Sequence, residues 1–123
     1  KMFLLIDQTD RCLIEKRPPT GIWPSLWGPP ERSIDTKLSV FMTHWGLSAK
    51  NIERQLTGPT LRHNFSHFRL LIEPVYVYFK VKKPIQLDQT LHRWHSQVLE
   101  SELGLSTVAK KLLETIPHYQ KPQ

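Results

Sequence analysis

Residues 13–27 read LIEKRPPTGIWPSLW, and this stretch decides how the rest of the chain is interpreted. It starts with apolar residues suited to a strand and continues into a segment rich in proline and tryptophan. Low-complexity proline runs are usually linkers. A linker, however, would not carry two tryptophans beside Ile22 and Leu26. We therefore predict a strand followed by a stiff, packed loop over 17–31.

The residues before this loop predict a β-hairpin. Residues 3–6 and 12–15 are largely apolar, and the polar residues 7–11 between them can form its turn. The apolar run at the start is too short for a signal peptide. Because the first residue is Lys1 and not methionine, we expect the chain to come from a longer protein.

Helical periodicity is clearest in two places beyond the loop. We predict helices over about 34–45 and 107–116, with Ser33 capping the first and Gly46 ending it. Each segment carries a one-sided apolar stripe. The first stripe consists of Ile34, Leu38, Phe41, Met42 and Trp45, and the second of Leu105, Val108, Ala109, Leu112, Leu113 and Ile116.

The region between these helices is predicted to contain mainly strands. Residues 48–56 suggest a short second helix, 61–81 are β-rich with a break at Pro74, and 91–98 form a weaker strand candidate. Hairpin, loop, helix, strands and helix in this order predict an α+β fold. We expect one domain over 1–123, with a mixed or antiparallel sheet and helices packed on its faces.

The composition excludes several classes of protein. The chain has 123 residues, enough for one domain with its own core. No stretch approaches the roughly 18 consecutive apolar residues of a membrane span, so no membrane is expected as a partner. A single cysteine, Cys12, excludes an intrachain disulfide and a cysteine-ligated cluster, and its apolar neighbours indicate a buried, inert thiol. The net charge of +6 suits a polyanionic partner, although many basic proteins bind none.

Candidate catalytic and metal-binding residues form no convincing pattern. His92 and His95 have no cysteine or carboxylate at a matching ligand spacing. His63 and His67 lack the glutamate that a zinc peptidase helix carries between its histidines. The eleven carboxylates are scattered, and the five glycines have no phosphate-loop spacing. We therefore predict neither a metal site nor paired acid–base catalysis.

Residues 61–69, LRHNFSHFR, are open to two interpretations. Arginines, histidines and a serine interleaved with phenylalanines suit a nucleic-acid surface, where arginine meets phosphate and aromatic rings stack on or wedge between bases. The same alternation also suits an ordinary strand with its aromatic side chains facing inward.

Two strings favour the first interpretation. LIEKRPPTGIWPSLW at 13–27 and RHNFSHF at 62–68 are similar to the two signatures of the C-terminal domain of MutY-type adenine DNA glycosylases, and LGL at 103–105 also fits. The resemblance implies a Nudix-like α/β/α sandwich around a mixed sheet. It implies a domain that recognises 8-oxoguanine opposite adenine in double-stranded DNA, in the nucleoid of the bacterial cytoplasm. The glycosylase domain, with its 4Fe-4S cluster, would be a separate N-terminal partner, and this domain would hold no cofactor and no catalytic residue.

The resemblance also implies roles for individual residues. A serine hydroxyl both donates and accepts, so Ser66 would read the oxidised base, and Phe65 would wedge at the base step. His63 and His67 would shape the loop or contact phosphate. By charge alone, the candidates for phosphate contacts are Arg62, Arg69, Lys80, Lys82 and Lys83.

The sequence departs from the family pattern in ways that leave rival functions open. Pro24-Ser25 replaces the usual Gly-Gly, and Ser39-Val40 and Thr43-His44 replace the carboxylates that hold magnesium in Nudix hydrolases. One rival is a divergent hydrolase of oxidised nucleotides, which would need magnesium ligands from Glu31, Asp35 or Glu53. The other is a protein-interaction module with an aromatic groove around Trp23 and Trp27.

Overall fold

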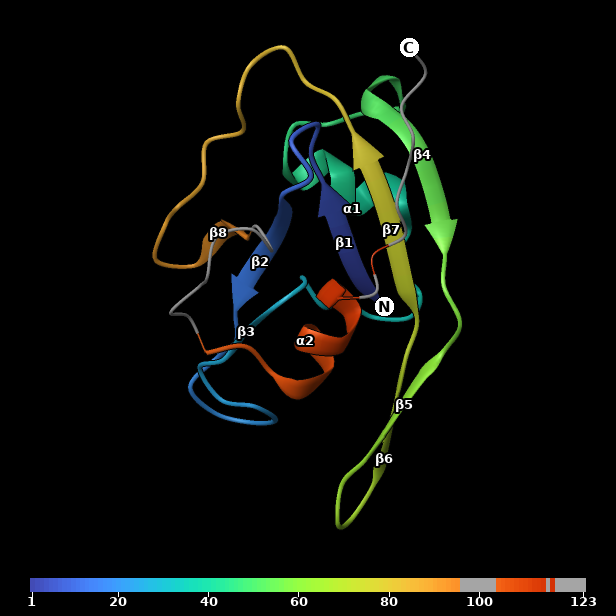
Figure 1. The fold of residues 1–123 in the computed structure, drawn as a ribbon, viewed down its shortest axis with the longest axis vertical. Helices are drawn as coiled ribbons and strands as arrows, with labels where there is room; N and C mark the ends of the chain where they lie inside the picture. Colours follow the sequence, from blue (N-terminus) through green and yellow to red (C-terminus); the bar gives the residue numbers. More distant parts are fainter. Residues whose placement is uncertain (96–103, 115, 117–123) are drawn as a thin grey trace.

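A mixed β-sheet lies between two helices in this computed structural model, which describes residues 1–95, 104–114 and 116 (Figure 1). The strand order is β3-β2-β1-β7-β4, with β8 also paired to β2. β1 and β7 are parallel and the other neighbours are antiparallel. The elements are β1 (Met2–Ile6), β2 (Cys12–Lys16), β3 (Trp27–Gly28), β4 (Ile52–Thr57), β7 (Pro74–Phe79), β8 (His92–His95), α1 (Leu38–His44) and α2 (Thr107–Glu114).

The sheet buries both of its faces, which confirms the predicted α/β/α sandwich. Consecutive strand residues point to opposite faces, and β1 supplies both sides of the core. Met2, Leu4 and Ile6 belong to the cluster that includes α2. Phe3 and Leu5 belong to the cluster that includes α1. A strand covered on both sides is apolar throughout, because no position along it faces water.

The predicted stiff loop is in part a strand that fills the gap between β1 and β2. Trp27 and Gly28 pair with β2, while the Pro30 carbonyl accepts a 2.9 Å hydrogen bond from the Phe3 amide. Gly28 also lies against α2, where a Cβ would come 3.2 Å from the Cβ of Ala109. Proline fits here because its missing N–H is not needed for pairing.

The first helix starts later than the apolar stripe predicts. α1 begins at Leu38 with Lys37 at its N-cap, so the predicted cap at Ser33 is wrong. The backbone carbonyl of Ser33 instead accepts a 2.9 Å hydrogen bond from the Thr36 amide in a turn. Ile34 therefore lies outside the helix and is 59% exposed. The predicted end is confirmed: Gly46 adopts a φ of 70°, the left-handed conformation that glycine tolerates after a helix.

The predicted short helix over 48–56 is wrong. A single 3-10 turn at Ala49–Asn51 leads directly into β4, which pairs with β7 at the edge of the sheet. The sequence of β4, IERQLT, is mostly polar because most of its side chains are exposed. Polar residues of this kind are equally common on a solvent-exposed helix.

The other predicted elements are confirmed within the described residues. Strands occupy 61–64, 69–72 and 74–79, so the break near Pro74 separates two strands. β8 is present at His92–His95, while 96–98 lie outside the described residues. α2 begins where the Ser106 hydroxyl accepts a 3.1 Å hydrogen bond from the Ala109 amide. No helix in the described part of the chain is long and apolar enough to cross a bilayer.

Candidate nucleic-acid interface

The segment around Phe65-Ser66-His67 forms a ribbon that projects beyond the main sheet (Figure 1). β5 (Leu61–Asn64) and β6 (Arg69–Ile72) pair antiparallel in a separate two-stranded sheet. A 2.8 Å hydrogen bond from the Phe65 amide to the Phe68 carbonyl closes the turn. Ser66 and His67 are therefore left exposed at the tip.

The register of the ribbon separates an exposed face from a packed one. Directly opposite residues of an antiparallel pair share a face. Arg62 pairs with Leu71 and Asn64 with Arg69, so both arginines lie on the exposed face. Arg69 is held there by a 3.2 Å hydrogen bond from its Nε to the Asn64 Oδ1. The packed face consists of Leu61, His63, Leu70 and Ile72.

An aromatic cluster supports the ribbon from the side of the proline-rich loop. The Trp23 ring lies 5.1 Å from His63 and 5.3 Å from Phe65, between ring centroids. Phe65 stacks on Phe68 at 4.6 Å, and Phe68 remains 48% exposed. Trp23, His63, Phe65 and Phe68, here named the aromatic cluster, join the two sequence motifs in space.

Arg17 fixes the position of Trp23 within its loop. Its Nε donates a 2.8 Å hydrogen bond to the Ile22 carbonyl, and its guanidinium forms an ion pair with Glu31. The guanidinium carbon also lies 5.6 Å from the centre of the Trp23 ring, within cation–π range. The surrounding contacts thus hold Trp23 in place although its φ is 48°, an unfavourable value for a bulky side chain.

A charged network holds the base of the same loop. Arg32 donates hydrogen bonds of 2.9 and 3.2 Å to the two carboxylate oxygens of Glu15, and His92 Nε2 lies 3.0 Å from Oε1. Burial raises the pKa of Glu15, but the hydrogen bonds and charges of Arg32 and His92 outweigh it and lower the pKa overall. The network joins β2 and β8 to the segment that follows β3.

The remaining titratable candidates have separate surroundings in the part of the chain that the structure describes. Cys12 is buried as predicted, and burial raises the pKa of its thiol, which keeps it protonated. Burial also lowers the pKa of His95, favouring its neutral form. Glu31 is paired with Arg17, and no three His, Cys, Asp or Glu side chains are placed to share a metal ion in residues 1–95, 104–114 and 116. The magnesium ligands of the hydrolase hypothesis are therefore not gathered there.

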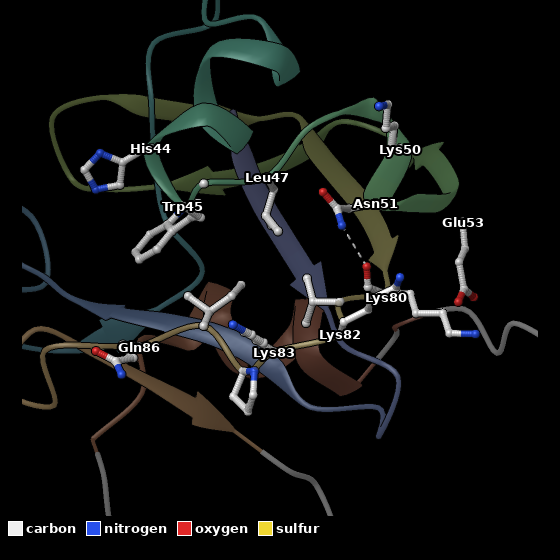
Figure 2. A pocket seen from close by; sticks show the side chains of 14 residues that line it. His44, Trp45, Leu47, Lys50, Asn51, Glu53, Lys80, Lys82, Lys83 and Gln86 are labelled. Atoms are coloured by element: carbon white, nitrogen blue, oxygen red, sulfur yellow. Dashed lines mark hydrogen bonds between the residues drawn. The ribbon is translucent and has the colours of Figure 1, made fainter.

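The predicted phosphate contacts fall into two separate groups. Arg62 and Arg69 lie on the ribbon, but Lys80, Lys82 and Lys83 follow the far end of β7 and line a cleft beside α1 (Figures 1 and 2). The hypothesis of a protein-binding aromatic groove around Trp23 and Trp27 is weakened, because Trp27 is only 6% exposed and is not available to a partner. Sequence reasoning missed that Arg17 and Trp23 support the ribbon, although both stand in the first motif.

Comparison with protein families agrees with this geometry. A family model described as a NUDIX domain matches residues 1–115. The match includes the proline-rich loop, both helix-forming segments and the projecting ribbon. Nearly the whole chain thus follows one family pattern, and its sheet between two helices is the fold which that pattern implies. The chain belongs to the NUDIX domain family.

Proposed function

We propose that this domain recognises 8-oxoguanine opposite adenine in double-stranded DNA, as the C-terminal part of a MutY-type adenine DNA glycosylase. The observation that carries the proposal is the projecting ribbon with Ser66 at its exposed tip and the aromatic cluster behind it. A two-stranded ribbon is narrow enough to enter a DNA groove. The Phe-Ser-His motif is thus presented outward on a supported element.

The chemistry at the tip suits the difference between the two bases. 8-Oxoguanine carries a hydrogen on N7 and an oxygen on C8, whereas guanine offers a bare N7 acceptor. The Ser66 hydroxyl can accept from the first and donate to the second. Each well-formed contact of this kind discriminates by about 1–3 kcal/mol.

The neighbouring residues take supporting roles in this proposal. Phe65 acts as the wedge at the base step, backed by Trp23 and Phe68. Arg62 and Arg69 contact phosphates, because they share the exposed face of the ribbon. His67 is exposed at the tip, while His63 packs within the aromatic cluster and shapes the loop.

The domain would act with a partner that performs the chemistry. In the proposed enzyme an N-terminal glycosylase domain, which contains a 4Fe-4S cluster, removes the mispaired adenine. The present domain would be non-catalytic and would direct that partner to the lesion. This division agrees with the positions Ser39, Val40, Thr43 and His44, none of which offers a carboxylate to a metal.

The test compares binding of this 123-residue chain to duplexes that contain either 8-oxoguanine·A or G·A, at low salt. The preference is the ratio of the affinities for these two duplexes. We expect this ratio to fall about tenfold in the Ser66→Ala, Phe65→Ala protein, which corresponds to the loss of one good contact. Ser39→Ala, at an exposed position of α1, is the matched control and should keep the preference.

Two results would contradict the proposal. One is an unchanged preference in the doubly substituted protein, which would remove the role of Ser66 and Phe65. The other is magnesium-dependent turnover of 8-oxo-dGTP by the unsubstituted chain, which would favour the hydrolase hypothesis instead.

A further inference from the structure

The last cross-strand pair of the ribbon, next to its tip, consists of Asn64 and Arg69 (Figure 1). The Phe65 amide donates to the Phe68 carbonyl, so these two residues form a hydrogen-bonded pair and the next pair along the ribbon does not. Side chains of a non-hydrogen-bonded pair lie closer together than those of a hydrogen-bonded one. The Asn64 Oδ1 accordingly accepts a hydrogen bond from the Arg69 Nε at 3.2 Å.

The partner of Arg69 is neutral, unlike that of three other arginines. Arg11, Arg17 and Arg32 each form an ion pair with a carboxylate. In the described part of the chain, Arg69 forms no ion pair. Asn64 therefore orients this guanidinium without cancelling its positive charge, and the charge remains available to an anion.

The hydrogen bond to Asn64 leaves most of the Arg69 guanidinium free. A guanidinium carries five N–H donors in a rigid plane, and among the residues that the structure describes only the donor on Nε has a partner. The donors on Nη1 and Nη2 form a fork that matches two oxygens of one phosphate. Both side chains are exposed, so a ligand can reach these nitrogens from solvent.

The hydrogen bond acts on the rotamers of Arg69 more than on the stability of the fold. Water competes for an exposed bond of this kind, so its net contribution to folding is small. An arginine side chain without a partner has many rotamers, and a ligand that fixes one of them loses part of its binding free energy. Because Asn64 restricts the rotamers of Arg69 before DNA arrives, the contact reduces that loss.

We infer that Asn64 is a positioning residue, which orients Arg69 for a bidentate contact with one phosphate of the DNA backbone. The inference rests on the proposed function, because it requires the ribbon to lie against DNA. Arg62 lies diagonally across the same face from Arg69, and such neighbours are roughly 7–8 Å apart. Phosphate contacts carry no sequence information, so Asn64 sets the affinity for DNA and not the choice of base.

The first test is a double-mutant cycle on the affinity of this 123-residue chain for duplex DNA, measured by fluorescence anisotropy. We expect Asn64→Ala to weaken binding about two- to tenfold, the range for ordering one long side chain. In the Arg69→Gln protein the same change should have no effect, because the group that Asn64 orients is gone. Arg62→Gln provides the matched control, and Asn64→Ala should keep its full effect there.

The salt dependence of binding separates orientation from charge. Each phosphate contact contributes about 0.9 to the magnitude of the slope of log affinity against log salt concentration. We expect Arg69→Gln to reduce the slope by about this amount, and Asn64→Ala to leave it unchanged because the arginine charge remains. Asn64→Asp should reduce the slope, since its carboxylate accepts from Arg69 but also neutralises it. A merely structural role for Asn64 would not produce this split.

Three results would overturn the inference. They are an effect of Asn64→Ala below twofold, the same effect with and without Arg69, and a slope that falls as much in Asn64→Ala as in Arg69→Gln. The duplexes are those with 8-oxoguanine·A and G·A, and Asn64→Ala should weaken both by the same factor. The ratio of the two affinities tests the proposed function through Ser66 and Phe65, so the two failures are distinguishable. Absence of binding to either duplex would contradict both proposals.

Discussion

Ser25 shows how a single residue departs from the family pattern at a structural cost. It occupies the second of two positions where glycine is usual in the MutY-type motif, and its φ is 59°. Residues with a Cβ lose about 1–2 kcal/mol in this left-handed conformation, whereas glycine adopts it freely. The loop keeps the conformation because the Ser25 amide binds the Pro18 carbonyl at 2.9 Å.

Replacing Ser25 by glycine should therefore stabilise the protein. We expect the free energy of unfolding to rise by about 0.5–1 kcal/mol, since the strain relieved exceeds the extra chain entropy of glycine. Urea unfolding of Ser25→Gly beside Ser33→Gly, a change at a position without this backbone constraint, measures the effect. Equal shifts in the two proteins would show that the strain at Ser25 is unimportant.

Glu15 makes stability depend on pH at the acid end. Its folded pKa lies below its ordinary value of 4.5 because of Arg32 and His92. The stabilising contribution is therefore complete above the unfolded pKa and is lost as the pH falls through the lower, folded pKa. Glu15→Gln should cost about 1–2 kcal/mol at pH 7, since a partly exposed charged hydrogen bond is replaced by a neutral one.

Chemical unfolding at a series of pH values tests this prediction. The Glu15→Gln protein should be less stable at pH 7 but should lose less stability between pH 5 and pH 3 than the unsubstituted protein. Asp35→Gln, at an exposed turn, serves as the control. Parallel pH profiles for Glu15→Gln and the unsubstituted protein would contradict the assignment.

Among the elements, the ribbon of β5 and β6 depends most on a residue outside itself. Isolated two-stranded hairpins are marginally stable in water, and this one gains support from Trp23 through His63 and Phe65. Trp23→Ala should leave the main sheet folded but loosen the ribbon. We expect amide hydrogen exchange in 61–72 to speed up at least tenfold, with little change in β1.

Trp23→Phe is the matched control for this experiment. It keeps an aromatic ring in the cluster and the same backbone demand at φ 48°, so exchange should remain near that of the unsubstituted protein. If amide exchange in Trp23→Ala becomes faster in β1 as well as in the ribbon, Trp23 stabilises the whole domain and not the ribbon alone.

The elements that sequence reasoning found are those with a local signal. The apolar stripe of α2 repeats within a few residues. Strand 74–79 is rich in β-branched and aromatic residues, and strand 69–72 directly before it is mostly apolar. β4 was missed because its signal is distant: it is a strand through pairing of Leu56 with Tyr76. β3 was missed because two residues are too few to show a period.

The candidate site, too, could be predicted only where its signal is local in the sequence. The motif containing Ser66 could be recognised from its letters, and the register of the ribbon then placed Arg62 and Arg69 together. The contact of Trp23 with Phe65 joins residues 42 positions apart and depends on the path of the intervening chain. Charge alone grouped Lys82 and Lys83 with those arginines, although β7 separates them.

At the scale of the whole molecule, the two charged surfaces lie at opposite ends of the strand direction. The ribbon precedes β7, and residues 80–86 follow it at the other end of that strand (Figure 1). Three lysines of this segment, Lys80, Lys82 and Lys83, line the cleft beside α1. The sandwich between them provides a rigid separation, because both of its faces are packed by a helix. Among the described residues, none of the ribbon lines the cleft, so a substitution in one of these surfaces removes no contact from the other.

The central position of β1 also has a consequence for how the protein is made. Met2 pairs with Pro74, 72 positions later in the chain. At roughly 5–20 residues per second, the ribosome delivers that partner about 4–14 s after β1. During this interval the apolar run MFLLI can pair with β2 but lacks its partner on the β7 side, and an apolar strand with an open edge is a target for chaperones and for aggregation. The central strand of the finished sheet thus has one unpaired edge until the β7 segment has been synthesised.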